Sequence, residues 1–93
     1  MLTHVVLFYL ADPADAEEVV RRLLAMEGRI PALLGVEAGV DQLPADRSAH
    51  VALITRHADA GGLAAYNEHP VHQELLAWVK PRVARTAKVD FTS

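Results

Sequence analysis

Hydrophobic residues run together near the start of the chain and then recur at helical spacing. Thr3 to Leu10 is apolar, contains β-branched and aromatic residues, and is too short for a stable helix, so it predicts a strand. Both faces of this strand are apolar, which indicates that it is covered on both sides. Asp12 followed by Pro13 predicts a helix start, because aspartate caps the first turn and proline suits the first helical position. Apolar residues then recur opposite charged ones as far as Met26, as in an amphipathic helix.

Two strands are predicted in the middle of the chain. Val36 to Leu43 alternates between apolar and polar residues, which is the period of a half-exposed strand. Pro44 to Ser48 is a polar turn, and His50 to His57 is again apolar. The pattern therefore predicts a β-hairpin with a loop of about five residues.

Two helical segments and a last strand follow. The first segment starts at Asp59 and should end near His69, because the residue before a proline is pushed out of the helical conformation. A second helix begins at Pro70, and Thr86 to Phe91 predicts a strand. The order β, α, β, β, α, β predicts one domain over residues 1–93 with the ferredoxin-like α+β fold. In this fold two helices cover one face of a four-stranded antiparallel sheet.

The other face of the predicted sheet has no helices over it. Periodicity places His4 and Val6, with His50 and Ala52, on the side that meets the helices. The opposite side is expected to carry Val5, Leu7, Tyr9, Val51 and Leu53. Hydrophobic residues make up 52% of this short chain, and a domain of 93 residues has a thin core. We therefore expect a second copy to cover the open face, giving a homodimeric two-sheet barrel.

Composition narrows the functional classes. The net charge is −3, and the basic residues are interspersed with acidic ones, so nucleic-acid binding is disfavoured. The chain has no cysteine, which excludes disulfides and thiol nucleophiles and favours a reducing cytoplasmic setting. The longest apolar run, Val5 to Ala11, is shorter than the roughly 20 residues of a membrane helix, and no basic residue precedes it as in a signal peptide. We expect a cytoplasmic protein without membrane or nucleic-acid partners.

Candidate chemistry is concentrated in AYNEHPVH, residues 65–72. Tyr66 and His72 would lie about 120° apart on one straight helix, so only a break at Pro70 lets them converge. In the first turn of the second helix, the positive end of the helix dipole should lower the pKa of His72. A neutral imidazole is what a general base needs, and Tyr66 could donate a proton or polarise a carbonyl. Asp90 could accept the second ring N–H of His72 and fix its tautomer.

Two other uses of these residues stay open. In a non-catalytic binding or stress-response module, Tyr66 would be a core aromatic, His69 a helix cap and His72 solvated, while His4 and His50 would bond to backbone carbonyls. Metal binding is the other use. The HPVH segment lacks the spacing of the HExxH zinc motif, and no carboxylate falls into a ligand pattern, so we expect neither a metal nor an organic cofactor.

The sequence resembles the stress-responsive dimeric α/β-barrel family, called Dabb, along nearly its whole length. The resemblance is carried by HVVLF, IPALLGVEAG, HVALIT, AYNEHPVH and the terminal VDF. It implies a ferredoxin-like monomer that dimerises through its sheet. The family includes a plant polyketide cyclase, olivetolic acid cyclase, which closes a linear tetraketide by aldol-type condensation. Its acid/base pair is similar to Tyr66 and His72, its pocket histidines to His4 and His50, and its terminal aspartate to Asp90.

These observations lead to one functional hypothesis with two alternatives. We expect a homodimer that binds a small polyketide-like or aromatic molecule between sheet and helices. If it is an enzyme, His72 and Tyr66 perform cofactor-free acid/base chemistry such as an aldol-type cyclisation. The substrate would contact His4, Val6, His50, Ala52 and Trp78, with Asp90 and His69 supporting the catalytic pair. The alternatives are the non-catalytic module and a monooxygenase that needs neither heme nor flavin.

Overall fold

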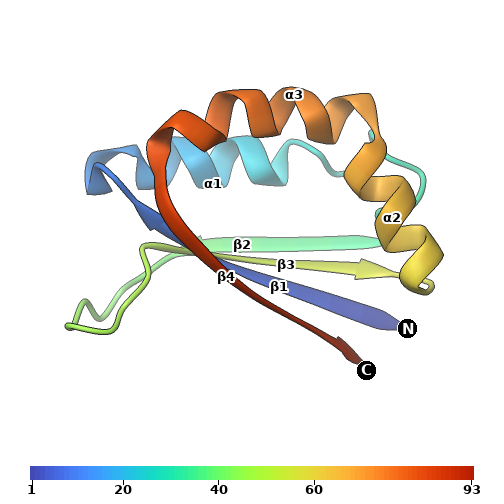
Figure 1. Ribbon diagram of the computed structural model, residues 1–93, viewed down its shortest axis with the longest axis horizontal. Coiled ribbons are helices and arrows are strands. Elements are labelled where there is room, and N and C mark those ends of the chain that lie inside the picture. The colour runs from blue at the N-terminus through green and yellow to red at the C-terminus, as the bar shows by residue number, and fades with distance from the viewer.

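Helices and sheet form two layers in the computed structural model, which describes residues 1–93 (Figure 1). The strands are β1 (Leu2–Leu10), β2 (Gly35–Val40), β3 (Val51–His57) and β4 (Val83–Thr92). The helices are α1 (Ala16–Leu24), α2 (Ala60–Glu68) and α3 (Pro70–Val79), with short 3₁₀ turns η1 (Pro13–Asp15) and η2 (Lys80–Arg82). The strand order β2-β3-β1-β4, with antiparallel pairing throughout, confirms the ferredoxin-like fold. None of the helices has the length and apolar character needed to cross a membrane.

Helix starts lie where the capping residues predict them. The Asp12 side chain accepts a hydrogen bond from the backbone N–H of Ala14 at 3.0 Å, although the first turn is 3₁₀ rather than α-helical. His69 is extended, with φ −64° and ψ 140°, so α2 ends just before it and α3 begins at Pro70. The Nδ1 atom of His69 accepts the N–H of Val71 at 3.1 Å. The predicted break between the two helices is therefore confirmed, and His69 is a helix cap.

A single core fills the space between the layers. Figure 1 shows α1 and α3 side by side above the sheet, with α2 across one end. Helix α1 buries Val19 and Leu23 of its apolar stripe in this core, and helix α3 buries Leu75 and Val79. Each such side chain contributes about 1.5–3 kcal/mol when fully buried. The remaining core residues are Phe8, Leu10, Ala16, Met26, Ile30, Leu33, Val51, Leu53 and Tyr66.

The register of β1 and β3 corrects the predicted faces of β3. Val6 pairs with Leu53 and Phe8 with Val51, and directly opposed residues point to the same side of a sheet. Val51 and Leu53 are therefore buried under the helices, not on the open face as predicted. Each face of β3 combines apolar with polar residues, so its alternation alone did not decide which face meets the helices. The faces of β1 are as predicted.

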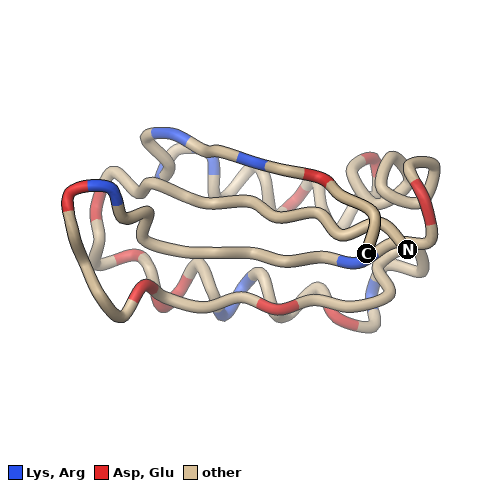
Figure 2. Tube along the Cα trace, turned by 90° about the horizontal axis from the view of Figure 1, so that it is seen from below, with Lys and Arg blue, Asp and Glu red and all other residues tan.

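The open face of the sheet is mainly apolar, and its charged residues are Glu37, Arg56 and Arg85. It carries Val5, Leu7, Tyr9, Ala52, Ile54, Ala87, Val89 and Phe91. Val89 is 55% exposed and Phe91 47% exposed, although both are large apolar side chains. Figure 2 looks onto this face, where β1 has no Asp, Glu, Lys or Arg and β3 has only Arg56. Contiguous apolar surface of this kind marks an interaction site.

Candidate functional site

A half-open pocket of about 310 Å³ lies between the sheet and helices α2 and α3. Nine of the 14 residues that line it are hydrophobic, and the polar ones are His4, Asn67, His72, Thr86 and Lys88. An apolar lining with a few converging polar groups, at the lower end of the usual volume range, is typical of a small-molecule site. The pocket includes Tyr66, His72, His4 and Val6 from the predicted set.

Tyr66 and His72 meet inside this pocket although they come from different helices. Their ring centroids are 4.5 Å apart, and the ring planes are inclined by 49°. Tyr66 is in the last turns of α2, and His72 is in the first turn of α3. The break at Pro70 thus produces the convergence that the sequence predicted.

The His72 ring is oriented by the end of α2. Its Nδ1 atom lies 3.0 Å from the carbonyl oxygen of Asn67, which can only accept, so Nδ1–H is the donor. In the neutral ring the lone pair is then on Nε2, which has no hydrogen-bond partner. Burial lowers the pKa of His72, although the Asn67 carbonyl acts in the opposite direction. The predicted direction of the pKa shift is confirmed, but its main cause is desolvation rather than the helix dipole.

Tyr66 also lines the pocket, and it carries a hydroxyl group although most of its side chain is an apolar ring. Its side chain is buried, and its hydroxyl donates to the sulfur of Met26 at 3.9 Å. Burial raises the pKa of Tyr66 to about 12. The phenol therefore stays protonated at neutral pH and can act as a hydrogen-bond donor.

His57 belongs to this cluster and was missed in the sequence. Its ring packs against Tyr66, with centroids 4.9 Å apart, so Tyr66 contacts two imidazoles. Nδ1 donates to the Ala32 carbonyl and Nε2 accepts from the Thr55 hydroxyl, both at 2.9 Å. Burial lowers the pKa of this fully buried ring. His57 alternates with Val51 and Leu53 along β3, so it lies on the same face of the strand. A correct assignment of that face would have identified His57 as a buried residue near the helices.

Asp90 supports His4 rather than His72. The register pairs His4 with Asp90, and His4 Nδ1 is hydrogen-bonded to the Asp90 carboxylate. Lys88 Nζ donates to the other carboxylate oxygen at 2.6 Å. These two hydrogen bonds, the Lys88 bond first, lower the pKa of Asp90. The predicted Asp90–His72 contact is therefore wrong, because the pairing of β4 with β1 places the carboxylate beside His4.

His50 and Ala52 lie outside the pocket, contrary to prediction. The residue of β3 opposite His4 is Thr55, so His50 is five positions further along, about 17 Å at the usual rise per residue. There His50 Nδ1 accepts the backbone N–H of Leu10 at 2.8 Å and borders a different hollow. Ala52 points to the open face of the sheet. His4 and His50 each directly precede an apolar run, but the two strands that carry these runs are antiparallel. The two histidines therefore lie toward opposite ends of the sheet.

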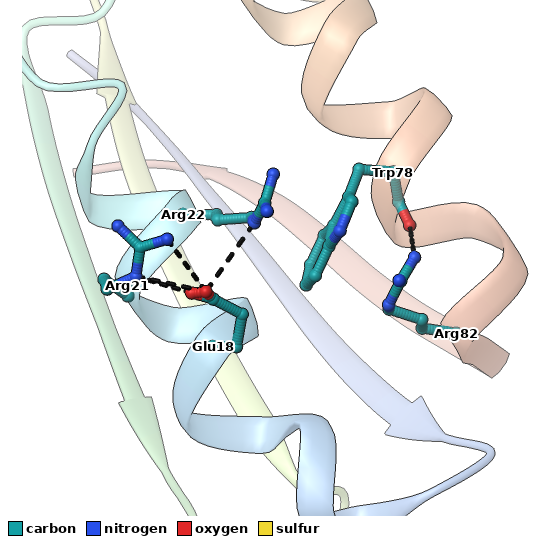
Figure 3. Close-up of polar contacts among 5 residues, drawn as sticks. All are labelled: Glu18, Arg21, Arg22, Trp78 and Arg82. Atoms are coloured by element: carbon teal, nitrogen blue, oxygen red, sulfur yellow. Dashed lines mark hydrogen bonds and ion pairs between the residues drawn. The ribbon is translucent and has the colours of Figure 1, made fainter.

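Trp78 also lies away from the pocket, in the contact between α1 and α3 (Figure 3). The guanidinium groups of Arg22 and Arg82 cover its ring, each 4.1 Å from the centroid. Because Leu75 and Val79 occupy the side of α3 that faces the sheet, the adjacent Trp78 points toward α1. Trp78 was predicted to contact the substrate, but its ring packs between two arginines at the contact of α1 and α3 instead.

The polar groups of the pocket form an acid/base set. His4 and His72 each use Nδ1–H in a hydrogen bond, so the neutral rings carry their lone pairs on Nε2. Tyr66 supplies a protonated phenol beside them. No three His, Asp or Glu side chains come together in an arrangement that could hold a metal ion.

The family model of the stress responsive A/B barrel domain matches residues 2–93. The chain belongs to this family. A dimeric ferredoxin-like protein of unknown function from Thermobifida fusca is 28% identical, with a TM-score of 0.86 over 99% of this chain and 90% of that one. Another dimeric protein of unknown function, from Bacteroides fragilis, is 20% identical, with a TM-score of 0.87 over 99% and 95%.

An antibiotic biosynthesis monooxygenase is also similar in structure to this Dabb domain. It is 17% identical, with a TM-score of 0.79 over 100% of this chain and 98% of that one. At such low identity the similarity shows the shared fold alone. No functionally curated protein matches the sequence.

Proposed function

We propose that this Dabb domain is a homodimer in which each pocket binds a small polyketide-like or aromatic molecule and catalyses cofactor-free proton transfer next to a carbonyl group. One observation carries the proposal: Tyr66 and His72 lie with ring centroids 4.5 Å apart in an apolar pocket. Their pKa values move in opposite senses, because burial lowers that of His72 and raises that of Tyr66 to about 12. Two neighbouring groups whose pKa values are shifted apart in this way are suited to the roles of base and acid.

The chemistry follows from the orientation of each group. His72 Nε2 takes a proton from the carbon beside a substrate carbonyl, while the Tyr66 hydroxyl donates to the developing enolate oxygen. The substrate oxygen replaces the Met26 sulfur as partner of that hydroxyl. In a molecule with a second carbonyl, the enolate carbon attacks it and closes a ring. The proton held by imidazolium then passes to the new alkoxide, so the base is regenerated.

Dimerisation through the open face accounts for its apolar side chains. Val89 and Phe91 would otherwise remain about half exposed to water, at 55% and 47%. The similar structures from Thermobifida fusca and Bacteroides fragilis are both described as dimeric. A stable interface of this kind needs a total buried area above about 1,000 Å².

Hydrogen–deuterium exchange at carbon tests the proposed chemistry before the natural substrate is known. Phenylacetone and 4-hydroxyphenylacetone are incubated with the protein in D₂O, and loss of the α-proton signals is followed by NMR. We expect His72→Ala to lower the catalysed rate about 10²- to 10⁴-fold. His50→Ala, a matched histidine outside the pocket, should leave the rate unchanged. Equal catalysed rates in wild type and His72→Ala would remove His72 from the role of base.

A non-catalytic binding module is the second candidate, and the Tyr66 hydroxyl favours it. Only 1% of this residue is exposed, and the hydroxyl already has a partner in Met26. In such a module the aryl ketones shift the NMR signals of pocket residues on binding, yet the wild-type protein does not accelerate exchange of their α-protons.

A further inference from the structure

Lys88 is the only Lys, Arg, Asp or Glu that lines the pocket. It lies on β4 opposite Val6, so it is on the face of the sheet that meets the helices. Thr86, two residues earlier on the same strand, lines the pocket as well. β4 therefore adds one cation and one hydroxyl to walls that are otherwise mostly apolar.

The ammonium group of Lys88 is hydrogen-bonded to one carboxylate, that of Asp90. Asp90 accepts from Lys88 Nζ at 2.6 Å through one oxygen and is bonded to His4 through the other. The side chain of Lys88 is 65% exposed and that of Asp90 22%, and Asp90 does not line the pocket. The Asp90 carboxylate is thus shared between two donors and does not itself line the pocket. An ammonium group has three N–H donors, so Lys88 retains two for another acceptor.

We propose that the molecule bound in this pocket is a small organic acid, whose carboxylate pairs with Lys88 at the solvent-facing side of the pocket. Its apolar part lies against the leucine and valine walls, and its carbonyl group reaches Tyr66 and His72. The positive charge of Lys88 attracts the full negative charge of a carboxylate more strongly than the dipole of a neutral group of the same shape, so Lys88 discriminates between the two. The inference rests on the proposed ligand pocket, but it does not require that the pocket be catalytic.

Pairs of acids and amides of nearly identical shape isolate the charge. The probes are 4-hydroxybenzoate with 4-hydroxybenzamide, and 4-hydroxyphenylacetate with 4-hydroxyphenylacetamide, titrated by NMR against isotope-labelled protein. We expect the wild type to bind each acid about five- to tenfold more tightly than its amide. Lys88→Met should abolish this preference, and Lys88→Arg should restore it. Arg29→Met removes the same charge from an exposed position outside the pocket and should retain the preference.

Two of the possible results would overturn this inference without overturning the proposed function. Amides that bind the wild-type pocket as tightly as acids would overturn carboxylate recognition and leave the pocket proposal standing. An acid preference that persists in Lys88→Met would overturn the role of Lys88. If no probe shifts the signals of pocket residues, both proposals fail. Salt provides a check without mutation, because salt screens the exposed ammonium group. In the wild type, the ratio of the affinity for the acid to the affinity for the amide should fall toward one between about 0.05 and 0.5 M salt.

Discussion

His57→Phe tests the claim that the buried, hydrogen-bonded imidazole of His57 stabilises the core beside Tyr66 and titrates at a lowered pKa. Phenylalanine keeps a ring against Tyr66 but leaves the Ala32 carbonyl and the Thr55 hydroxyl without their partner. Each buried polar group without a partner costs about 1–3 kcal/mol. We therefore expect the free energy of unfolding at pH 7.5 to fall by about 2–6 kcal/mol for the two groups together. This is a large share of the roughly 5–15 kcal/mol that stabilises most domains.

The same substitution should also change how stability depends on pH. Burial lowers the pKa of folded His57 from 6.5, so the unfolded chain takes up a proton at a higher pH than the folded chain does. Stability is therefore lost as the pH falls through 6.5, until the folded pKa is reached. Each pH unit between the two pKa values costs about 1.4 kcal/mol. His72, whose pKa is also lowered, adds a loss of the same sign.

Urea unfolding at pH 7.5, 6.5 and 5.5 measures both effects. The fluorescence of Trp78, the only tryptophan, reports unfolding, and the protein concentration is held fixed because dimerisation would couple to stability. We expect a shallower pH dependence in His57→Phe than in wild type. Thr55→Val is the matched control, since it removes the partner of Nε2 without removing the titrating ring, and it should keep the pH dependence. An unchanged slope in His57→Phe would refute the assignment.

Three further substitutions separate the interface, the helix cap and the pocket. Leu7→Glu places a charge at the centre of the open face, so light scattering should show a mass near the 10.1 kDa of one chain instead of that of a dimer. A dimeric variant would contradict the proposed interface. His69→Ala removes the cap of α3 and should lower the free energy of unfolding by about 0.5–2 kcal/mol, whereas His69→Asn should retain most of the wild-type stability. Equal stabilities of His69→Ala and the wild type in thermal melts would argue against capping. Tyr66→Phe removes only a weak bond to sulfur, so stability should change by less than about 1 kcal/mol while α-proton exchange slows at least tenfold. Exchange at the wild-type rate would exclude the hydroxyl from the chemistry.

Features set by neighbouring residues could be predicted from the sequence. Asp12 starts the first helix and Pro70 separates the second from the third, because capping and proline sterics act within one turn of the chain. The convergence of Tyr66 and His72 followed from the same local break. The strand order of the fold followed from the succession of elements.

Features set by strand register could not be predicted in this way. The partner of Asp90 depends on which residues of β1 and β4 oppose each other, and nothing near Asp90 in sequence specifies that His4 is the one. β4 begins at Val83 rather than Thr86, since it pairs with β1 along almost its whole length. His57 was missed and His50 misplaced for the same reason, because the face and the end of β3 that meet the pocket are fixed by its pairing with β1.

The pH dependence of ketone exchange, set beside the NMR titration of His72, tests the central claim most directly. If neutral His72 is the base, the exchange rate rises with pH through one midpoint, which lies below 6.5 and equals the pKa measured for the His72 ring. With the pKa of Tyr66 at about 12, the rate should then stay level through pH 9. An exchange rate whose midpoint differs from the titration of His72, or one that falls between pH 7 and 9, would contradict the assignment of the Tyr66–His72 pair as acid and base.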